Sequence, residues 1–133
     1  MTVEYIYDEK ENFIYTKFSG IITDEDLENQ AKAVAVDPRV KPGARELVDL
    51  RAVDSVEAST ETLGFIIFTD KEHRKKFEGM RIAIVAPRDL LFGLSKIFEV
   101  LSDVENAPSE INVFRTMAEA KRWLNIQQKH PIP

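Results

Sequence analysis

The sequence contains no cysteine and only two histidines, His73 and His130. Without thiols, the chain can form neither a disulfide scaffold nor a cysteine nucleophile. Neither histidine has a partner at metal-ligand spacing, no H-E-x-x-H motif occurs, and no serine lies in a G-x-S-x-G turn. We therefore interpret both histidines as surface residues and predict that the protein has no metal site and is not an enzyme.

Glycine is scarce as well, and its five copies are scattered at positions 20, 43, 64, 79 and 93. A phosphate-binding loop needs several glycines close together, so that the backbone can approach a nucleotide. The sequence therefore predicts no nucleotide site and no cofactor.

Long apolar runs are also missing. The longest is the six-residue stretch Leu63-Gly64-Phe65-Ile66-Ile67-Phe68, whereas a membrane-spanning helix needs about 20 residues. The first residues lack the basic and apolar regions of a secretory signal. These features predict a cytoplasmic protein with no integral membrane segment.

Positive charge is in deficit, with 18 Lys+Arg against 23 Asp+Glu and a net charge of −5. Such a balance lacks the basic surface of a non-specific nucleic-acid binder, so no nucleic-acid partner is expected. With 133 residues, of which 44% are hydrophobic, the chain is long enough for one domain with its own core. We place the domain at residues 1–125 and expect residues 126–133 to be a disordered tail.

Two kinds of pattern alternate along that domain. Residues 3–7 and 13–19 are β-branched and aromatic runs on either side of a polar loop, which predicts an antiparallel hairpin. Short apolar strands at 46–50, 81–86 and 111–114 alternate with helices, so these three strands are expected to be parallel. The sequence predicts an α/β domain with a mixed sheet of about five strands and about four helices. Thr23 before three acids, Asp89, and Thr116 with Glu119 are the expected helix caps.

Three arginines, Arg51, Arg88 and Arg115, each follow a predicted parallel strand and precede a helix. The carboxyl ends of such strands share one edge of the sheet, where helix N-termini and guanidinium groups can bind a carboxylate or phosphate. The alternative is that each arginine forms a local ion pair. The acids available for it are Asp49 or Asp54, Asp89 and Glu110.

Apolar residues exceed what one core face needs. In the helix that starts at residue 90, one arc is expected to face the core, namely Leu90, Leu91, Leu94, Ile97, Phe98 and Leu101, with Phe92 on the other side. In the helix expected over residues 60–77, Phe65 and Phe68 project away from the face of Leu63, Ile66, Ile67 and Phe77. These three phenylalanines predict a subunit interface, a partner groove or a lipophilic pocket, unless the helices are covered nearly all round.

The order of elements, together with Leu47-Val48-Asp49-Leu50-Arg51, residues 81–87 with Gly93, and residues 113–115 followed by 119–124, resembles the SpoIIAA-like branch of the STAS superfamily. The resemblance covers residues 3 to 125. It implies a non-enzymatic α/β domain of the anti-sigma factor antagonist type, related in fold to small lipid-binding domains.

Regulatory members of that superfamily are phosphorylated on a serine of an Asp-Ser pair at the start of a helix. Here the pair falls on Glu57-Ala58, so the acceptor position is an alanine. Ser59 and Ser55 are the nearby candidates for phosphorylation, and Ser59 is alternatively an N-cap.

These observations predict a STAS-like interaction or regulatory module that docks a protein partner or a small anionic or lipophilic ligand at the carboxyl edge of the sheet. The expected contact residues are Arg51, Ser59, Arg88, Arg115, Phe65, Phe68 and Phe92. A homodimer through the apolar surface is expected. One alternative is a phospho-regulated antagonist of an anti-sigma factor, and another is an enzyme that uses Asp49, Asp54 and Asp89.

Overall fold

The computed structural model describes residues 3–130 and contains one mixed sheet with the strand order β1-β2-β3-β4-β5. β1 is antiparallel to β2, and the other neighbouring strands pair in parallel, which confirms the predicted fold class. The elements in chain order are β1 (Val3–Asp8), β2 (Phe13–Thr23), α1 (Asp24–Val36), β3 (Arg45–Glu57), α2 (Thr60–Glu72), α3 (Arg74–Phe77), β4 (Arg81–Val85), α4 (Asp89–Val104), β5 (Glu110–Phe114) and α5 (Met117–Leu124).

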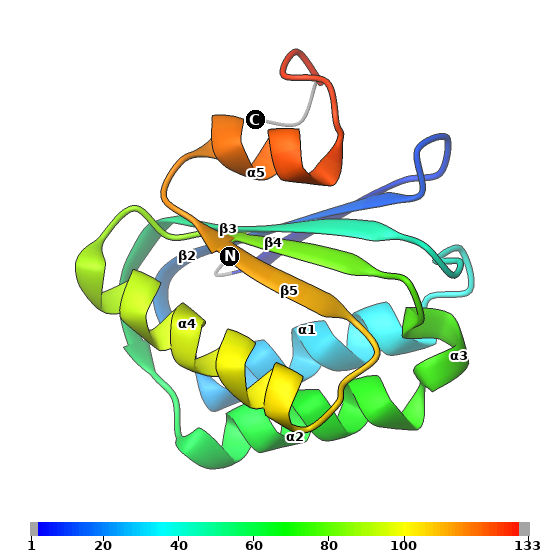
Figure 1. Cartoon of the computed structure of the whole chain (residues 1–133). Coiled ribbons are helices and arrows are strands. Elements are labelled where there is room, and N and C mark those ends of the chain that lie inside the picture. The colour runs from blue at the N-terminus through cyan, green and yellow to red at the C-terminus, as the bar shows by residue number, and fades with distance from the viewer. Residues whose placement is uncertain (1–2, 131–133) are drawn as a thin grey trace.

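The helices divide unevenly between the two faces of the sheet (Figure 1). α5 alone covers one face, where Phe13, Tyr15, Leu47 and Leu124 form a core cluster. α1, α2, α3 and α4 lie on the other face. Because side chains alternate along a strand, consecutive residues of β2 and β3 supply these two cores in turn. None of the described helices has the length and apolar character needed to cross a membrane.

β3 is much longer than the predicted strand over residues 46–50. Its pairing with β4 ends at Asp49 opposite Val85, but its pairing with β2 continues to Glu57 opposite Thr23. Among the described residues, the second half of β3 therefore has a neighbouring strand on one side only. Charged residues such as Arg51 and Asp54 stay in solvent there, which is why the segment does not have the apolar composition of a buried strand.

The helix expected over residues 60–77 is divided into α2 and α3. His73 separates them and has a non-helical backbone, with φ −108° and ψ 39°. Its ring Nδ1 lies 2.9 Å from the Thr69 carbonyl oxygen and its ring meets Phe77 edge-on. The imidazole therefore has a local packing role at the junction of the two helices.

The tail that was expected to be disordered is packed on the domain over its described part, residues 126–130. Ile126 is buried in the α5-side core. The His130 side chain is only 10% exposed, with Nε2 2.9 Å from Asp8 Oδ2 and the ring edge-on to Phe13. The interpretation of His130 as a surface residue is therefore wrong. Residues 131–133 lie outside the described residues.

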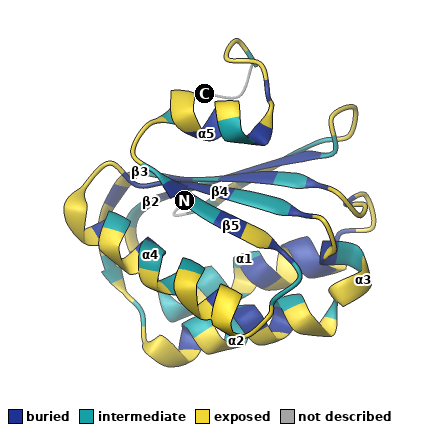
Figure 2. Cartoon of the chain, viewed as in Figure 1, coloured by how far each residue is buried: buried dark blue, intermediate teal, exposed yellow. Residues whose placement is uncertain are grey.

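The predicted core face of the helix at residues 90–101 is correct for Leu91 and Phe98, which belong to or pack against a core cluster, and wrong for the other four residues. Leu91, Ser95 and Ser102 are the buried residues of α4, whereas Leu90, Leu94, Ile97 and Leu101 are exposed. Figure 2 shows the resulting exposed stripe along α4. Apolar content alone favoured the arc with more leucines, but the contact with the sheet uses the arc that carries the two small serines.

Capping was predicted correctly at two of the three helices. Thr23 accepts a hydrogen bond from the Asp26 backbone, and the Asp26 side chain accepts one from the Thr23 backbone. Thr116 accepts one from the Glu119 backbone. At α4 the N-cap residue is Arg88, which makes no side-chain cap, and Asp89 is the first helical residue. Asp89 is therefore not a cap.

We expect Thr23→Ala to lower the free energy of unfolding by about 1 kcal/mol, because the first turn of α1 loses its hydroxyl acceptor. Ser59→Ala is the matched control, since Ser59 is the N-cap of α2 but forms no side-chain cap hydrogen bond. Urea denaturation followed by circular dichroism measures both. Equal losses in the two variants would contradict the assigned role of the Thr23 cap.

Candidate functional site

A cavity of about 180 Å³ lies between the sheet and helices α1, α2 and α4. Its lining is mostly apolar and draws on every strand from β2 to β5. Among the residues that line it are Phe18, Val48, Leu50, Ile66, Ile82 and Phe98.

The cavity exists because the helices do not close over the middle of the sheet. α2 packs on α1, and α4 packs on β5. Val48 and Leu50 of β3, with Ile82 of β4, are therefore only partly buried although they lie in the central strands. Partly buried apolar residues in the middle of a sheet mark a surface that can take further apolar contact.

A buried carboxyl group lies within this apolar lining. Glu46 is 4% exposed, and its Oε2 accepts hydrogen bonds from Thr16 Oγ1 (2.9 Å) and Gln30 Nε2 (2.7 Å). Burial raises the pKa of Glu46 to about 7, the two hydrogen bonds act to lower it, and the charge of Asp70 adds to the rise. Glu46 is therefore only partly ionised near neutral pH.

Further polar groups line the same cavity. The Asp70 carboxyl accepts a hydrogen bond from Ser109 Oγ at 2.8 Å, and burial raises the pKa of Asp70 despite this bond. Ser102 Oγ is buried and, among the described residues, has no hydrogen-bond partner. Sequence reasoning missed all of these groups. Only the position of Glu46, two residues before Val48 on the same strand face, signalled an acid on an apolar face.

Arg51 forms the local ion pair that was the alternative to a ligand site. Its Nε and Nη2 bond the two Asp49 oxygens at 3.0 and 2.9 Å, and Tyr15 donates to Asp49 Oδ2 at 2.6 Å. Asp49 is 1% exposed. Burial acts to raise the pKa of Asp49, but the bonds from Arg51 and Tyr15 outweigh it and hold the pKa below its ordinary value. Arg51 lies within β3 and not past its end.

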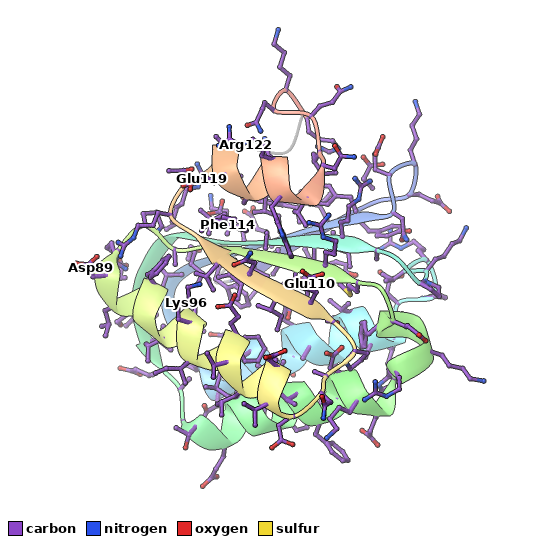
Figure 3. The ribbon with its side chains drawn as sticks, in the orientation of Figure 1. Asp89, Lys96, Glu110, Phe114, Glu119 and Arg122 are labelled. Atoms are coloured by element: carbon purple, nitrogen blue, oxygen red, sulfur yellow. The ribbon has the colours of Figure 1, made fainter. Side chains whose placement is uncertain are left out.

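The other two arginines also lie outside the cavity. Arg115 Nη1 is 2.6 Å from Asp89 and 3.1 Å from the Pro87 carbonyl, and its guanidinium lies over the Phe92 ring at 4.2 Å. Figure 3 labels Asp89 at the start of α4, away from the helix C-terminus. Arg88 is exposed, and its side chain forms no hydrogen bond or ion pair with any residue in the range 3–130.

Ser59 lies beside a carboxylate. Asp24 Oδ1 accepts hydrogen bonds from the Ser59 backbone at 2.7 Å and from Thr62 Oγ1 at 2.6 Å, and it lies 3.4 Å from Ser59 Oγ. Asp24 thus joins the first turns of α1 and α2. A phosphate on Ser59 would meet this negative charge, which disfavours it. Ser55 is exposed on β3, and phosphorylation at either position stays a prediction.

The three phenylalanines do not share one environment. Phe65 is partly buried with Lys32 of α1 over its ring, whereas Phe92 lies between Arg115 and Lys96. Phe68 is 58% exposed. The larger apolar surface is on α4, where Leu90, Leu94, Ile97, Leu101 and Val104 are all exposed. Sequence reasoning placed four of these five residues in the core.

The carboxyl groups considered for catalysis have three different settings. Asp49 is buried in its pair with Arg51, Asp54 is exposed, and Asp89 is exposed beside Arg115. Within residues 3–130, no group of three or more His, Cys, Asp or Glu side chains could hold a metal ion.

A mixed five-stranded sheet with four helices over one face and a single helix over the other defines a small α/β module of the STAS type. A SpoIIAA-like family model matches residues 13–125. The chain therefore belongs to the SpoIIAA-like family. This membership suggests an anti-sigma factor antagonist-like module of the kind that is generally non-enzymatic and interacts with partner proteins.

A solved structure supports the same fold. It is an uncharacterized protein from the DUF3478 family, with a SpoIIAA-like fold, from Shewanella loihica PV-4. It matches with 20% sequence identity and a TM-score of 0.56, over 92% of this chain and 91% of that chain. At this identity the likeness concerns the fold. No curated protein sequence matches the chain.

We expect Arg51→Ala to lower the free energy of unfolding at pH 7 by about 1.5–3 kcal/mol, because it leaves Asp49 buried without its charged partner. The low pKa of Asp49 stabilises the fold above the ordinary aspartate pKa, and this contribution disappears as the pH falls. The difference in the free energy of unfolding between wild type and Arg51→Ala should therefore become smaller below about pH 4. Denaturation in urea at pH 7 and pH 3 measures it.

Arg88→Ala is the control for this variant. It removes another exposed arginine, one that has no partner among residues 3–130, so a change within about 0.5 kcal/mol in the free energy of unfolding is expected. If Arg51→Ala were as neutral as Arg88→Ala, the Arg51–Asp49 pair would not contribute to stability.

Proposed function

We propose that the protein is a non-enzymatic binding module that holds a small lipophilic molecule in the cavity between the sheet and α1, α2 and α4. The observation that carries this proposal is the apolar cavity of about 180 Å³, with partly buried Val48, Leu50 and Ile82 in the central strands. Family membership supports it, since that membership suggests an interaction module and not an enzyme.

The size of the cavity limits the ligand. An engineered apolar cavity of about 150 Å³ in another protein takes benzene. The 180 Å³ here suits a molecule with one aromatic ring and a short side chain. Burying the apolar surface of such a molecule and of the cavity lining supplies the binding free energy.

This proposal moves the ligand away from the arginine edge. Arg51 and Arg115 already bind Asp49 and Asp89, so an anion at that edge would have to compete with their carboxylates. The N-terminus of α2 is likewise occupied by the Asp24 carboxylate. The lipophilic part of the prediction is therefore retained, with a different set of contact residues.

The test is to fill the cavity. Ser102→Leu replaces a buried hydroxyl without a partner among the described residues by an apolar group in the space that the ligand would use. We expect the affinity for ethylbenzene to fall about tenfold or more. We expect the free energy of unfolding to change by less than about 1.5 kcal/mol. Removing a buried hydroxyl that lacks a partner stabilises the fold, and this gain offsets the cost of fitting a larger side chain. Titration followed by ¹H–¹⁵N NMR measures binding.

Ser55→Leu is the matched control, because Ser55 is exposed on β3 and does not line the cavity. It should leave the affinity unchanged. If wild type showed no binding, or if Ser102→Leu bound ethylbenzene as tightly as wild type, the cavity would not be the ligand site.

A second candidate function is self-association through α4. Its exposed apolar residues Leu90, Leu94, Ile97, Leu101 and Val104 follow the 4-3-4-3 spacing of a helix-pairing seam. A second copy of this chain presents the same seam, as a two-fold interface requires. The predicted homodimer is therefore kept, with α4 in place of the three phenylalanines as its contact surface.

We expect Ile97→Glu to weaken this dimer about tenfold or more, because it buries a charge in the centre of the seam. Val36→Glu is the control, since Val36 is 73% exposed on α1, outside the seam. Sedimentation equilibrium over a range of protein concentrations measures the dissociation constant. A wild-type protein that stayed monomeric, or two variants with equal effects, would contradict the seam as the interface.

A further inference from the structure

The lining of the cavity is mostly apolar, and its ionisable side chains are acidic. Two acids, Glu46 and Asp70, line it together with the hydroxyls of Ser95, Ser102 and Ser109. No lysine or arginine lines it over residues 3–130.

Five cations of the surrounding helices have other partners, and Lys75 of α3 is exposed and does not line the cavity. Lys32 of α1 lies over Phe65, and Lys96 of α4 pairs with Glu99. Lys71 of α2 pairs with Glu105. Arg74 of α3 donates to the Asn106 carbonyl, although its charge reaches Asp70 and acts to lower the pKa of that group. Lys76 of α3 donates to the backbone carbonyl of Ala35.

Glu46 itself has unused hydrogen-bonding capacity. Both of its donors, Thr16 and Gln30, bind the same oxygen, Oε2. Among residues 3–130, no side chain or backbone N–H donates to Oε1, although Glu46 is only 4% exposed. A carboxylate in a low-dielectric site is stabilised strongly by a charged donor.

We propose that the ligand is a lipophilic amine whose ammonium group binds the free oxygen of Glu46 while its hydrocarbon part lies against the apolar lining. This inference rests on the proposed function and names the ligand's chemical class. Asp70 lines the same cavity and its charge acts on Glu46, so the lining carries a second acid that favours a cation. A carboxylic acid in the same cavity would be repelled by the carboxyl groups of Glu46 and Asp70, so it should bind less tightly than an amine.

The amine should bind more tightly as the pH rises from 6 to 8. Glu46 loses its proton over this range, because burial raises its pKa to about 7, whereas an alkylammonium keeps its charge. The groups that face Glu46 are Thr16 from β2, Gln30 from α1 and, through its charge, Asp70 from α2. α4 contributes only serine hydroxyls and apolar side chains to the cavity.

The test uses four probes with a common ring and different head groups: ethylbenzene, 2-phenylethanol, 2-phenylethylamine and phenylacetic acid. Each is titrated into wild type, Glu46→Gln and Glu57→Gln at pH 8 by ¹H–¹⁵N NMR. Glu46→Gln keeps the shape of the side chain and an acceptor for Thr16 and Gln30. Glu57→Gln removes the same charge from an exposed position of the same strand.

The expected result is that wild type and Glu57→Gln bind the amine about tenfold or more tightly than the acid, and that Glu46→Gln loses most of this preference. Ethylbenzene should bind all three proteins equally. Wild type should also lose affinity for the amine, but not for ethylbenzene, when the pH is lowered to 6. This last comparison needs no variant and holds even if Glu46→Gln does not fold.

Two results would overturn the inference in distinguishable ways. If the four probes bound wild type equally, or the alcohol or acid bound best, the amine would be excluded while the cavity proposal stood. If none of the probes bound, ethylbenzene included, the proposed function itself would fail and the inference with it.

Discussion

The parallel pairing of β2 with β3 is the constraint on which the rest of the structure depends. It brings Tyr15 and Asp49 together on the α5 side, and Thr16 and Glu46 together on the other side. It also continues beyond β4, as far as Thr23 opposite Glu57. Since α1 begins directly after β2 and α2 shortly after β3, the same pairing places their first turns next to each other, where Asp24 joins them.

That arrangement explains why the core on the α5 side of the sheet is closely packed whereas the other side contains a cavity. On the α5 side, small residues of β4 and the aromatic residues of β2 pack closely, and Leu47 and Leu124 are fully buried. On the other side, α2 packs on α1 and α4 packs on β5, so the helices cover the sheet from its two edges and leave its middle less covered. The cavity results from the placement of helices that are each well packed on their own neighbour.

Sequence reasoning predicted the parts of the fold that depend on local chemistry. Thr23 and Thr116 were identified as caps from their own neighbours, and the alternation of apolar strands with helices gave the sheet. It failed where the outcome depends on which surfaces meet. Leu90, Leu94 and Leu101 of α4 and the overhang of β3 were not predicted, since a stripe of apolar residues has the same pattern whether it faces a sheet or solvent. Glu46 was overlooked because an acid in a short strand is usually a solvated residue.

The overhang of β3 also matters for how the molecule avoids aggregation. Within residues 3–130, this strand has no partner on the β4 side from Leu50 to Glu57. An unpaired strand edge can recruit a strand from another molecule. Arg51, Asp54 and Glu57 interrupt that edge with charges of both signs, and irregular pairing after Lys17 and Gly20 of β2 bends the ribbon. Residues that contribute nothing to a ligand site thus keep a long exposed ribbon from becoming a template for a fibril.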